Sequence, residues 1–118
     1  MNWKSAFDPR NEIVLSTTKK NGDPHAIYVL SMGIVDNKVV IGVCLMKTTL
    51  ENIKNNKKAV VVGKCDDGYF RIYGEVNLYP SGKYLDKAVT HSRPPMPEEA
   101  LTIEIEEVYD MGNQKKII

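Results

Sequence analysis

Residues 39–53 read VVIGVCLMKTTLENI, and the interpretation of the whole chain starts from this stretch. The run from Val39 to Met46 is apolar and rich in β-branched residues, which predicts a central strand covered on both faces. Directly after it, residues 49–56 are expected to form a short helix with Leu50 and Ile53 as its inward-facing pair. The chain therefore passes from a buried strand into a helix across a short polar junction.

The junction residues Lys47, Thr48 and Thr49 suit the binding of a phosphate. The first turn of a helix carries backbone N–H groups without intrahelical partners and a partial positive charge, so it attracts anions. A phosphorylated ligand is one hypothesis for this junction. The other is plain helix capping, because Thr48 and Glu51 also fit the capping-box pattern, which requires no ligand. The segment alone leaves both hypotheses open.

Length and composition indicate a single domain over residues 1–118 and exclude several classes of function. The chain is 42% hydrophobic and 26% charged, as ordinary globular domains are. Its formal net charge of +1 provides no basic excess for a nucleic acid. No apolar run approaches the ~20 residues that cross a bilayer, and no signal-peptide core follows Met1. We therefore expect a cytoplasmic protein that binds neither nucleic acid nor membrane.

The remaining pattern predicts an all-β domain. Asn21-Gly22 and Asp36-Asn37 mark hairpin turns, Gly74 inside a strand indicates a bulge, and Ser81 is expected to cap a second helix. Six predicted strands and two short helices favour a closed or nearly closed antiparallel β-barrel. The predicted strands cover residues 12–19, 24–32, 38–46, 59–65, 69–79 and 101–106.

The sequence assigns no catalytic residue and no metal site. His25 and His91 stand outside any nucleophile motif, and no cluster of Cys and His has ligand spacing. No Gly-x-Gly-x-x-Gly opens a helix, so a Rossmann cofactor site is not expected. The strands could instead line a flat apolar slot for an aromatic cofactor, unless these side chains are simply barrel core. The slot residues would be Tyr28, Leu30, Ile41, Val43 and Met46.

The order of these features resembles the FMN-binding split-barrel family, whose best-known member is pyridoxamine 5'-phosphate oxidase. The family implies a six-stranded antiparallel split barrel that forms a homodimer with FMN at the subunit interface. Small stand-alone FMN-binding proteins of the family are similar in size. The resemblance rests on VLSTT (14–18), NGDPH (21–25), the strand at 39–46, KTTLEN (47–52) and GYFRIYGEV (68–76).

The resemblance also implies which residues would bind the cofactor. In the family a basic residue, a Thr or Ser, and an Asn three residues later hold the phosphate, which here points to Lys47, Thr48, Thr49 and Asn52. The cation is displaced by one position, because Thr48 stands directly before Thr49. The second and third strands would frame the isoalloxazine ring, mostly through their backbone. Its candidate contacts are Tyr28, Val29, Leu30, Val43 and Cys44.

The function that this resemblance implies is that of an FMN-binding flavoprotein, either a small redox protein or an oxidoreductase. Pyridoxamine phosphate oxidases carry a substrate-binding segment after the last strand that has no counterpart before Ile118, so that activity is not expected. Ile117 and Ile118 would instead fold over the flavin of the partner subunit. The alternative is a non-enzymatic barrel that binds haem or a deazaflavin, or no cofactor.

Overall fold

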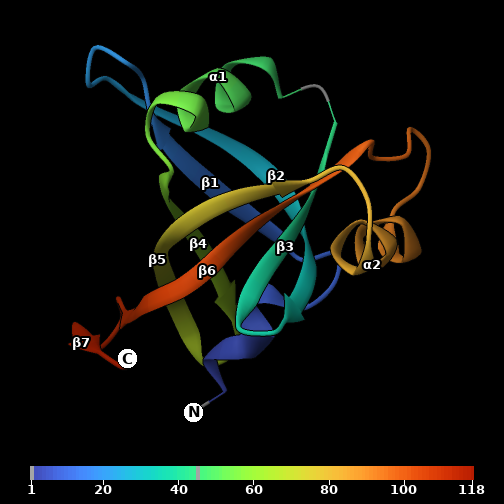
Figure 1. Ribbon diagram of the computed structural model, residues 1–118. Coiled ribbons are helices and arrows are strands. Elements are labelled where there is room, and N and C mark those ends of the chain that lie inside the picture. The colour runs from blue at the N-terminus through green and yellow to red at the C-terminus, as the bar shows by residue number, and fades with distance from the viewer. Residues whose placement is uncertain (1, 45) are drawn as a thin grey trace.

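The computed structural model describes residues 2–44 and 46–118, and its strands form the predicted antiparallel barrel (Figure 1). In this part of the chain the sheet order is β3-β2-β1-β4-β5-β6-β7, and β3 also pairs with β6, which closes the barrel. The all-β fold class is therefore confirmed. The strands are β1 (Glu12–Thr18), β2 (Pro24–Val35), β3 (Lys38–Val43), β4 (Lys58–Cys65), β5 (Gly68–Tyr79), β6 (Glu99–Asp110) and β7 (Lys115–Lys116). The helical segments are η1 (Trp3–Phe7), α1 (Lys47–Asn55) and α2 (Lys83–His91).

Local turns and one long-range pairing build the barrel. The turns after β1, β2 and β4 make antiparallel neighbours of strands that are consecutive in sequence, as predicted. Closure comes from β3 and β6, which pair from Lys38 opposite Glu104 to Val43 opposite Glu99. The predicted bulge is confirmed, since the register of β5 against β6 shifts beside Gly74. A side chain at Gly74 would collide with the carbonyl oxygen of Glu104, so the bulge requires glycine.

The barrel is split on one side, between β2 and β3. β2 pairs with β1 along the whole of β1, but it pairs with β3 only from Ser31 onward, and the register shifts before Ile34. Gly33 lies in this shift with a φ of +103°, a left-handed conformation that glycine adopts readily. The Ser31 hydroxyl fixes the bend, because it donates to the carbonyl of Phe7 (2.6 Å) and accepts from the Gly33 amide (3.0 Å). Residues 24–30 therefore diverge from β3, and α1 lies across the open end (Figure 1).

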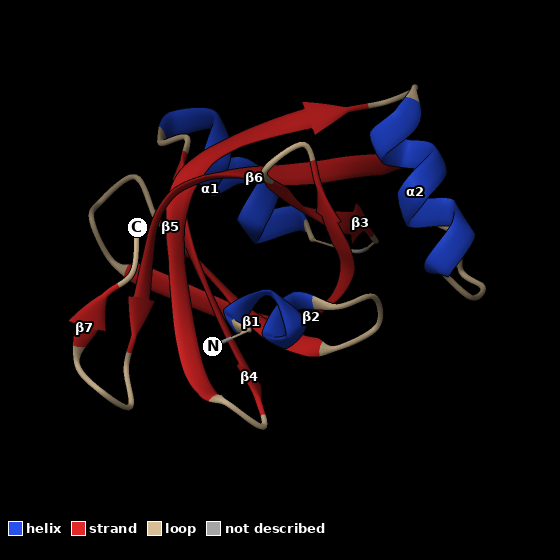
Figure 2. Cartoon of the chain, turned by 90° about the horizontal axis from the view of Figure 1, so that it is seen from below, coloured by secondary structure: helices blue, strands red, loops and turns tan. Residues whose placement is uncertain are grey.

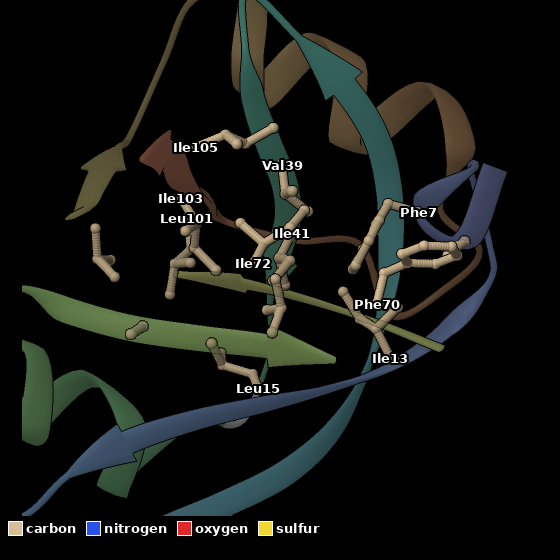
Figure 3. Packing of buried hydrophobic residues seen from close by; sticks show 14 of the residues in the cluster. Phe7, Ile13, Leu15, Val39, Ile41, Phe70, Ile72, Leu101, Ile103 and Ile105 are labelled. Carbon is tan, nitrogen blue, oxygen red and sulfur yellow. The ribbon is translucent and has the colours of Figure 1, made fainter. Parts of the chain in front are cut away.

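Two apolar clusters hold the barrel and its helices together. The larger one fills the barrel and includes the buried side chain of Phe7 from η1 (Figure 3). Trp3 of η1 belongs to the same cluster. The smaller one lies outside the barrel, where Tyr84 and Ala88 of α2 pack against β2, β3 and β6. Figure 2 shows α2 on the opposite side of the molecule from β7. This packing holds α2, and the loop that follows it, beside the split.

The end of β3 and the start of α1 differ from the prediction. β3 ends at Val43 instead of residue 46, and Leu45 lies outside the described residues. α1 begins at Lys47 with Met46 as its N-cap and has no side-chain capping bond. Of the two hypotheses for this junction, the capping box at Thr48 is therefore wrong. Met46 packs into the barrel core, and this burial explains why the helix starts earlier than the Thr-x-x-Glu pattern indicated.

The second helix, unlike the first, begins later than predicted. α2 starts at Lys83, and its N-cap is Gly82, whose φ of +95° suits glycine. No side chain caps this helix, so the prediction that Ser81 does so is wrong. None of the helices in the described residues is long and apolar enough to cross a membrane.

Candidate functional site

A cleft of about 510 Å³ opens where the barrel is split, and we call it the main cleft. One wall is the part of β2 that has left β3, and the other is the end of β3 with the residues after it. The volume lies within the range of about 300–1,000 Å³ that is typical of small-molecule sites. The walls include Tyr28, Val29, Leu30, Gly42, Cys44 and Met46.

Two strand edges border this cleft without a strand partner in the described part of the chain. Residues 24–30 of β2 pair with β1 on one edge only. Gly42 and Val43 of β3 pair with Ala100 and Glu99 of β6 on one edge and with no strand on the other. Unpaired backbone N–H and C=O groups need hydrogen-bond partners. These edges can therefore bind the polar rim of a flat ring placed between them.

Most of the predicted ring contacts lie around this opening. Tyr28 is 78% exposed, which leaves a large aromatic surface uncovered at the cleft. Val43 lines an adjoining cleft of about 490 Å³, which we call the side cleft. Ile41 is fully buried in the barrel, so it is a core residue and not part of the slot. The predicted contacts that line the main cleft are Tyr28, Val29, Leu30 and Cys44.

A loop after α2, residues 92–97, borders both clefts, and we call it the strap. Pro95 lines both clefts, and its carbonyl oxygen lies 3.7 Å from the Sγ of Cys44. Gly42 lets the strap lie close to β3, because a Cβ added there would be 3.0 Å from the Cβ of Pro97. The sequence predicts a rigid, extended linker over residues 93–97, and in the structure these residues lie outside helix and strand. Its proline content was the available signal of a rigid loop.

The start of α1 borders the side cleft with an uncapped first turn. No side chain caps it, and no acidic residue lies in that turn. The first backbone hydrogen bond of the helix runs from the amide of Leu50 to the carbonyl of Met46 (2.9 Å). The amides of Lys47, Thr48 and Thr49 therefore have no carbonyl of the helix to donate to. Lys47 and Thr48 are exposed, and Lys47 lines the side cleft. The helix dipole and Lys47 favour an anion at this position, whereas Glu98 and Glu99, which line the same cleft, oppose it.

The structure does not bring all the predicted phosphate residues together. Thr49 is 1% exposed, and its buried hydroxyl has no hydrogen-bond partner. Asn52 is 4% exposed, and its Nδ2 donates to the hydroxyl of Thr17 (3.0 Å). Thr48 and Asn52 line a separate hollow between α1 and the β1–β2 hairpin. Of the predicted phosphate residues, Lys47 is the one that borders the side cleft.

Other residues at the main cleft escaped the sequence analysis. They are Arg10, before β1, and Arg93 and Pro95 in the strap. These segments are far apart in the sequence, and only the fold brings them to one opening. No spacing rule connects them, so the proline run of the strap was the sole local signal.

The charge pairs that shift pKa values lie away from the main cleft. Lys83 hydrogen-bonds to Asp36 and holds the pKa of that carboxyl below its ordinary value. Glu106 bonds to Lys58 (2.9 Å) and raises the pKa of that ammonium group. Within residues 2–44 and 46–118, no three His, Cys, Asp or Glu side chains are grouped as metal ligands would be.

Comparison with known proteins places this geometry in context. A family model described as pyridoxamine 5'-phosphate oxidase matches residues 3–112. No curated protein sequence matches the chain. Three solved structures illustrate the likeness, and at these identities they show a shared fold.

HupZ from Group A Streptococcus superposes with a TM-score of 0.82 at 18% identity, over 100% of both chains. An FMN-binding protein from Syntrophomonas wolfei superposes with a TM-score of 0.69 at 17% identity, over 91% of this chain and 80% of that one. An F420 reductase gives a TM-score of 0.72 at 15% identity, over 92% of this chain and 96% of that one.

Proposed function

Because the chain belongs to the pyridoxamine 5'-phosphate oxidase family, we propose that it is a flavoprotein that binds FMN and serves electron transfer or the reduction of a small molecule. One observation carries the proposal. The split between β2 and β3 places two unpaired strand edges around a cleft near the uncapped start of α1. A flat ring with a polar rim and a phosphate-ended side chain matches both parts of this site.

The ring of the cofactor would lie between β2 and β3. Leu30, Met32 and Met46 provide apolar surface for the ring and exclude water from it. The backbone of residues 24–30 and of Gly42 provides unpaired N–H and C=O groups for its polar rim. Flat aromatic cofactors require this combination of apolar walls and a few placed polar groups.

The phosphate would lie at the start of α1. The amides of Lys47 and Thr48 precede the first intrahelical bond, and the ammonium group of Lys47 adds a full positive charge. The hydroxyl of Thr49 is buried and has no hydrogen-bond partner. A phosphate oxygen can therefore reach this hydroxyl only if the residues that bury it move. Asn52 is already bonded to Thr17. Phosphate binding by Thr49 and Asn52 therefore stays a prediction, whereas the exposure of Lys47 supports its role directly.

When bound, FMN supplies the redox chemistry, and the protein supplies binding and orientation. This chain acts by positioning the cofactor. The apolar walls shield the ring from water, and the unpaired backbone groups of the strand edges fix the orientation of the ring. Among the described residues that line the main cleft, Glu12 has no histidine beside it to act as an acid–base partner. We therefore assign no catalytic residue.

The same proposal includes a homodimer with FMN at the subunit interface. A row of side chains crosses the outer face of the sheet in register, through Tyr28, Val14, Val62, Arg71 and Tyr109. Tyr28 is mostly exposed, and Val14 and Val62 are only half-buried. The part of the row formed by Tyr28, Val14 and Val62 is apolar, and exposed apolar surface of this kind favours a protein contact. Because the row begins with Tyr28 at the main cleft, a second copy docked on it would border the cofactor.

The tail is the proposed cover of the partner's flavin. Ile117 and Ile118 are 37% and 53% exposed, and the amide of Ile117 donates to the carbonyl of Val108 (2.8 Å). β7, just before them, lies on the opposite side of the molecule from α2 and its strap (Figure 2). They thus lie away from the main cleft of their own chain. A variant without residues 114–118 that keeps both FMN affinity and flavin spectrum would reject this role.

Absorption spectroscopy of the purified protein tests the FMN proposal. We expect flavin bands in the protein as purified or after incubation with FMN, with FMN released on denaturation. A dimer should be measured by sedimentation in the same sample. A protein with haem or deazaflavin bands, or a colourless protein that takes up no FMN, would contradict the proposal and support the alternative binding function.

A further inference from the structure

Two arginines from distant parts of the chain line the main cleft, and the proposed function does not use them. Arg10 lies between η1 and β1, and Arg93 lies in the strap after α2. Both side chains are exposed, and neither forms an ion pair within the described residues. Glu12 is the one carboxylate among the described residues that line the same cleft. The opening is therefore positively charged in a chain that is nearly neutral overall.

Arg10 is held in place from both its backbone and its side chain. Its φ is +71°, in the left-handed region that residues with a bulky side chain seldom adopt. Its amide donates to the carbonyl of Ser31 (2.6 Å), and its Nη1 donates to the carbonyl of His91 (2.9 Å). One bond to His91 leaves other N–H groups of the guanidinium available. Glycine or asparagine would fit this backbone better, which points to a use for the arginine side chain.

Arg93 is carried on a fixed segment. The hydroxyl of the preceding Ser92 donates to the carbonyl of Ala88 (2.6 Å), which ties the strap to the last turn of α2. Two prolines, Pro94 and Pro95, follow directly and restrict the backbone. The guanidinium of Arg10 and the backbone of Arg93 are thus held in place before any ligand arrives, which reduces the entropy lost on binding.

We propose that Arg10 and Arg93 bind the carboxylate or phosphate group of the substrate that enters the main cleft. Guanidinium groups bind oxyanions through paired N–H donors. Leu30 and Met32 make the cleft apolar, and a flavin ring bound against them would present its flat face to the substrate, so the preferred substrate has an apolar or aromatic body with one anionic group. This inference rests on the proposed function. It concerns a different anion from the FMN phosphate, which belongs at the start of α1.

A structural role for Arg10 alone is the competing explanation. Its bond to His91 could serve only to satisfy a carbonyl at the C-terminal end of α2. Arg93 has no hydrogen bond of this kind among the described residues, so its replacement distinguishes the two explanations. Lys64, on β4, is exposed and lines none of the clefts described here. Its replacement removes one positive charge elsewhere and is the matched control.

Amide chemical-shift titrations of the full chain, with and without FMN, test the proposal. The probes are benzoate and phenyl phosphate, with neutral benzamide for comparison. We expect at least one anion to shift the amides of Leu30, Met32 and Gly42, and benzamide to bind at least fivefold more weakly. Arg10→Gln and Arg93→Gln should each weaken anion binding at least fivefold, while Lys64→Gln leaves it unchanged. The preferred anion then distinguishes a carboxylate substrate from a phosphorylated one.

The proposal is overturned if neither anion shifts these amides, if benzamide binds equally well, or if Arg93→Gln binds the anions as the parent does. If Arg10→Gln has a lower melting temperature and an unchanged anion affinity, Arg10 serves only to cap α2, and this result also overturns the proposal. The flavin spectrum of the same samples reports on the cofactor independently. Anion binding without FMN uptake rejects the flavin function, whereas FMN uptake without anion binding rejects this inference alone.

Discussion

Replacing Lys47 with alanine is the sharpest test of how the proposed phosphate site works. Lys47 is exposed at the start of α1, where no side chain caps the helix and no acidic residue lies in the first turn. A hydrogen bond to a charged group contributes about 1.5–3 kcal/mol. Since Lys47 is exposed and its charge is screened by solvent, we take the lower end of this range. FMN should therefore bind about tenfold more weakly to Lys47→Ala, because about 1.4 kcal/mol corresponds to a factor of ten.

Riboflavin has the same ring and no phosphate, so its affinity should not change in Lys47→Ala. The assay is quenching of flavin fluorescence in parallel titrations with FMN and riboflavin. Lys54→Ala is the matched control, because Lys54 lies near the other end of α1, is exposed, and lines the separate hollow. Equal losses for FMN and riboflavin, or an equal loss of FMN affinity in Lys54→Ala, would refute the reasoning.

Three further predictions concern the stability of the fold. Gly74→Ala should lower the free energy of unfolding by about 3 kcal/mol or more, since an added methyl collides with the backbone of β6; Gly112→Ala, with only an ordinary contact at 3.5 Å, should have little effect in the same urea titration. Thr49→Val should stabilise the protein by about 1 kcal/mol because it removes an unpartnered buried hydroxyl, and a loss of FMN affinity in this variant would instead show that the hydroxyl binds the phosphate. Because Lys83 lowers the pKa of Asp36 from its ordinary 3.8, the carboxylate should stabilise the fold above that value and lose its contribution as the pH falls through the lower folded pKa. Asp36→Asn should therefore flatten the acid limb of the unfolding midpoint against pH, and an unchanged acid limb would refute this.

Local patterns predicted most of the barrel, but not the ends of its helices. Turn residues such as Asn21-Gly22 and the apolar alternation of the strands indicate hairpins directly, because both act between neighbours in sequence. The closing pair of β3 and β6 joins distant segments, so it followed only from the number of strands and the family resemblance. The Thr48 capping box failed because burial of Met46 outweighs the preference of a polar cap.

The candidate site was predicted in part, and the division has a physical reason. Tyr28, Leu30 and Cys44 lie on or just after strands that the pattern had already placed, so their presence at the cleft followed from the strands. Arg10 and Arg93 lie outside regular structure, and only the packing of η1 and α2 against the barrel brings them to the same opening. The sequence motif also did not predict which way the side chains of α1 point. The pattern Thr49-x-x-Asn52 predicts one helical face, and the structure turns that face inward.

A crystal structure of the protein incubated with FMN tests the central claim most directly. We predict that the isoalloxazine ring lies in the main cleft between Leu30 and Gly42, with the phosphate at the amides and ammonium group of Lys47. The claim is contradicted if the flavin lies in the hollow beside Lys54 or elsewhere on the barrel. It is also contradicted if side chains fill the main cleft and no flavin is bound there.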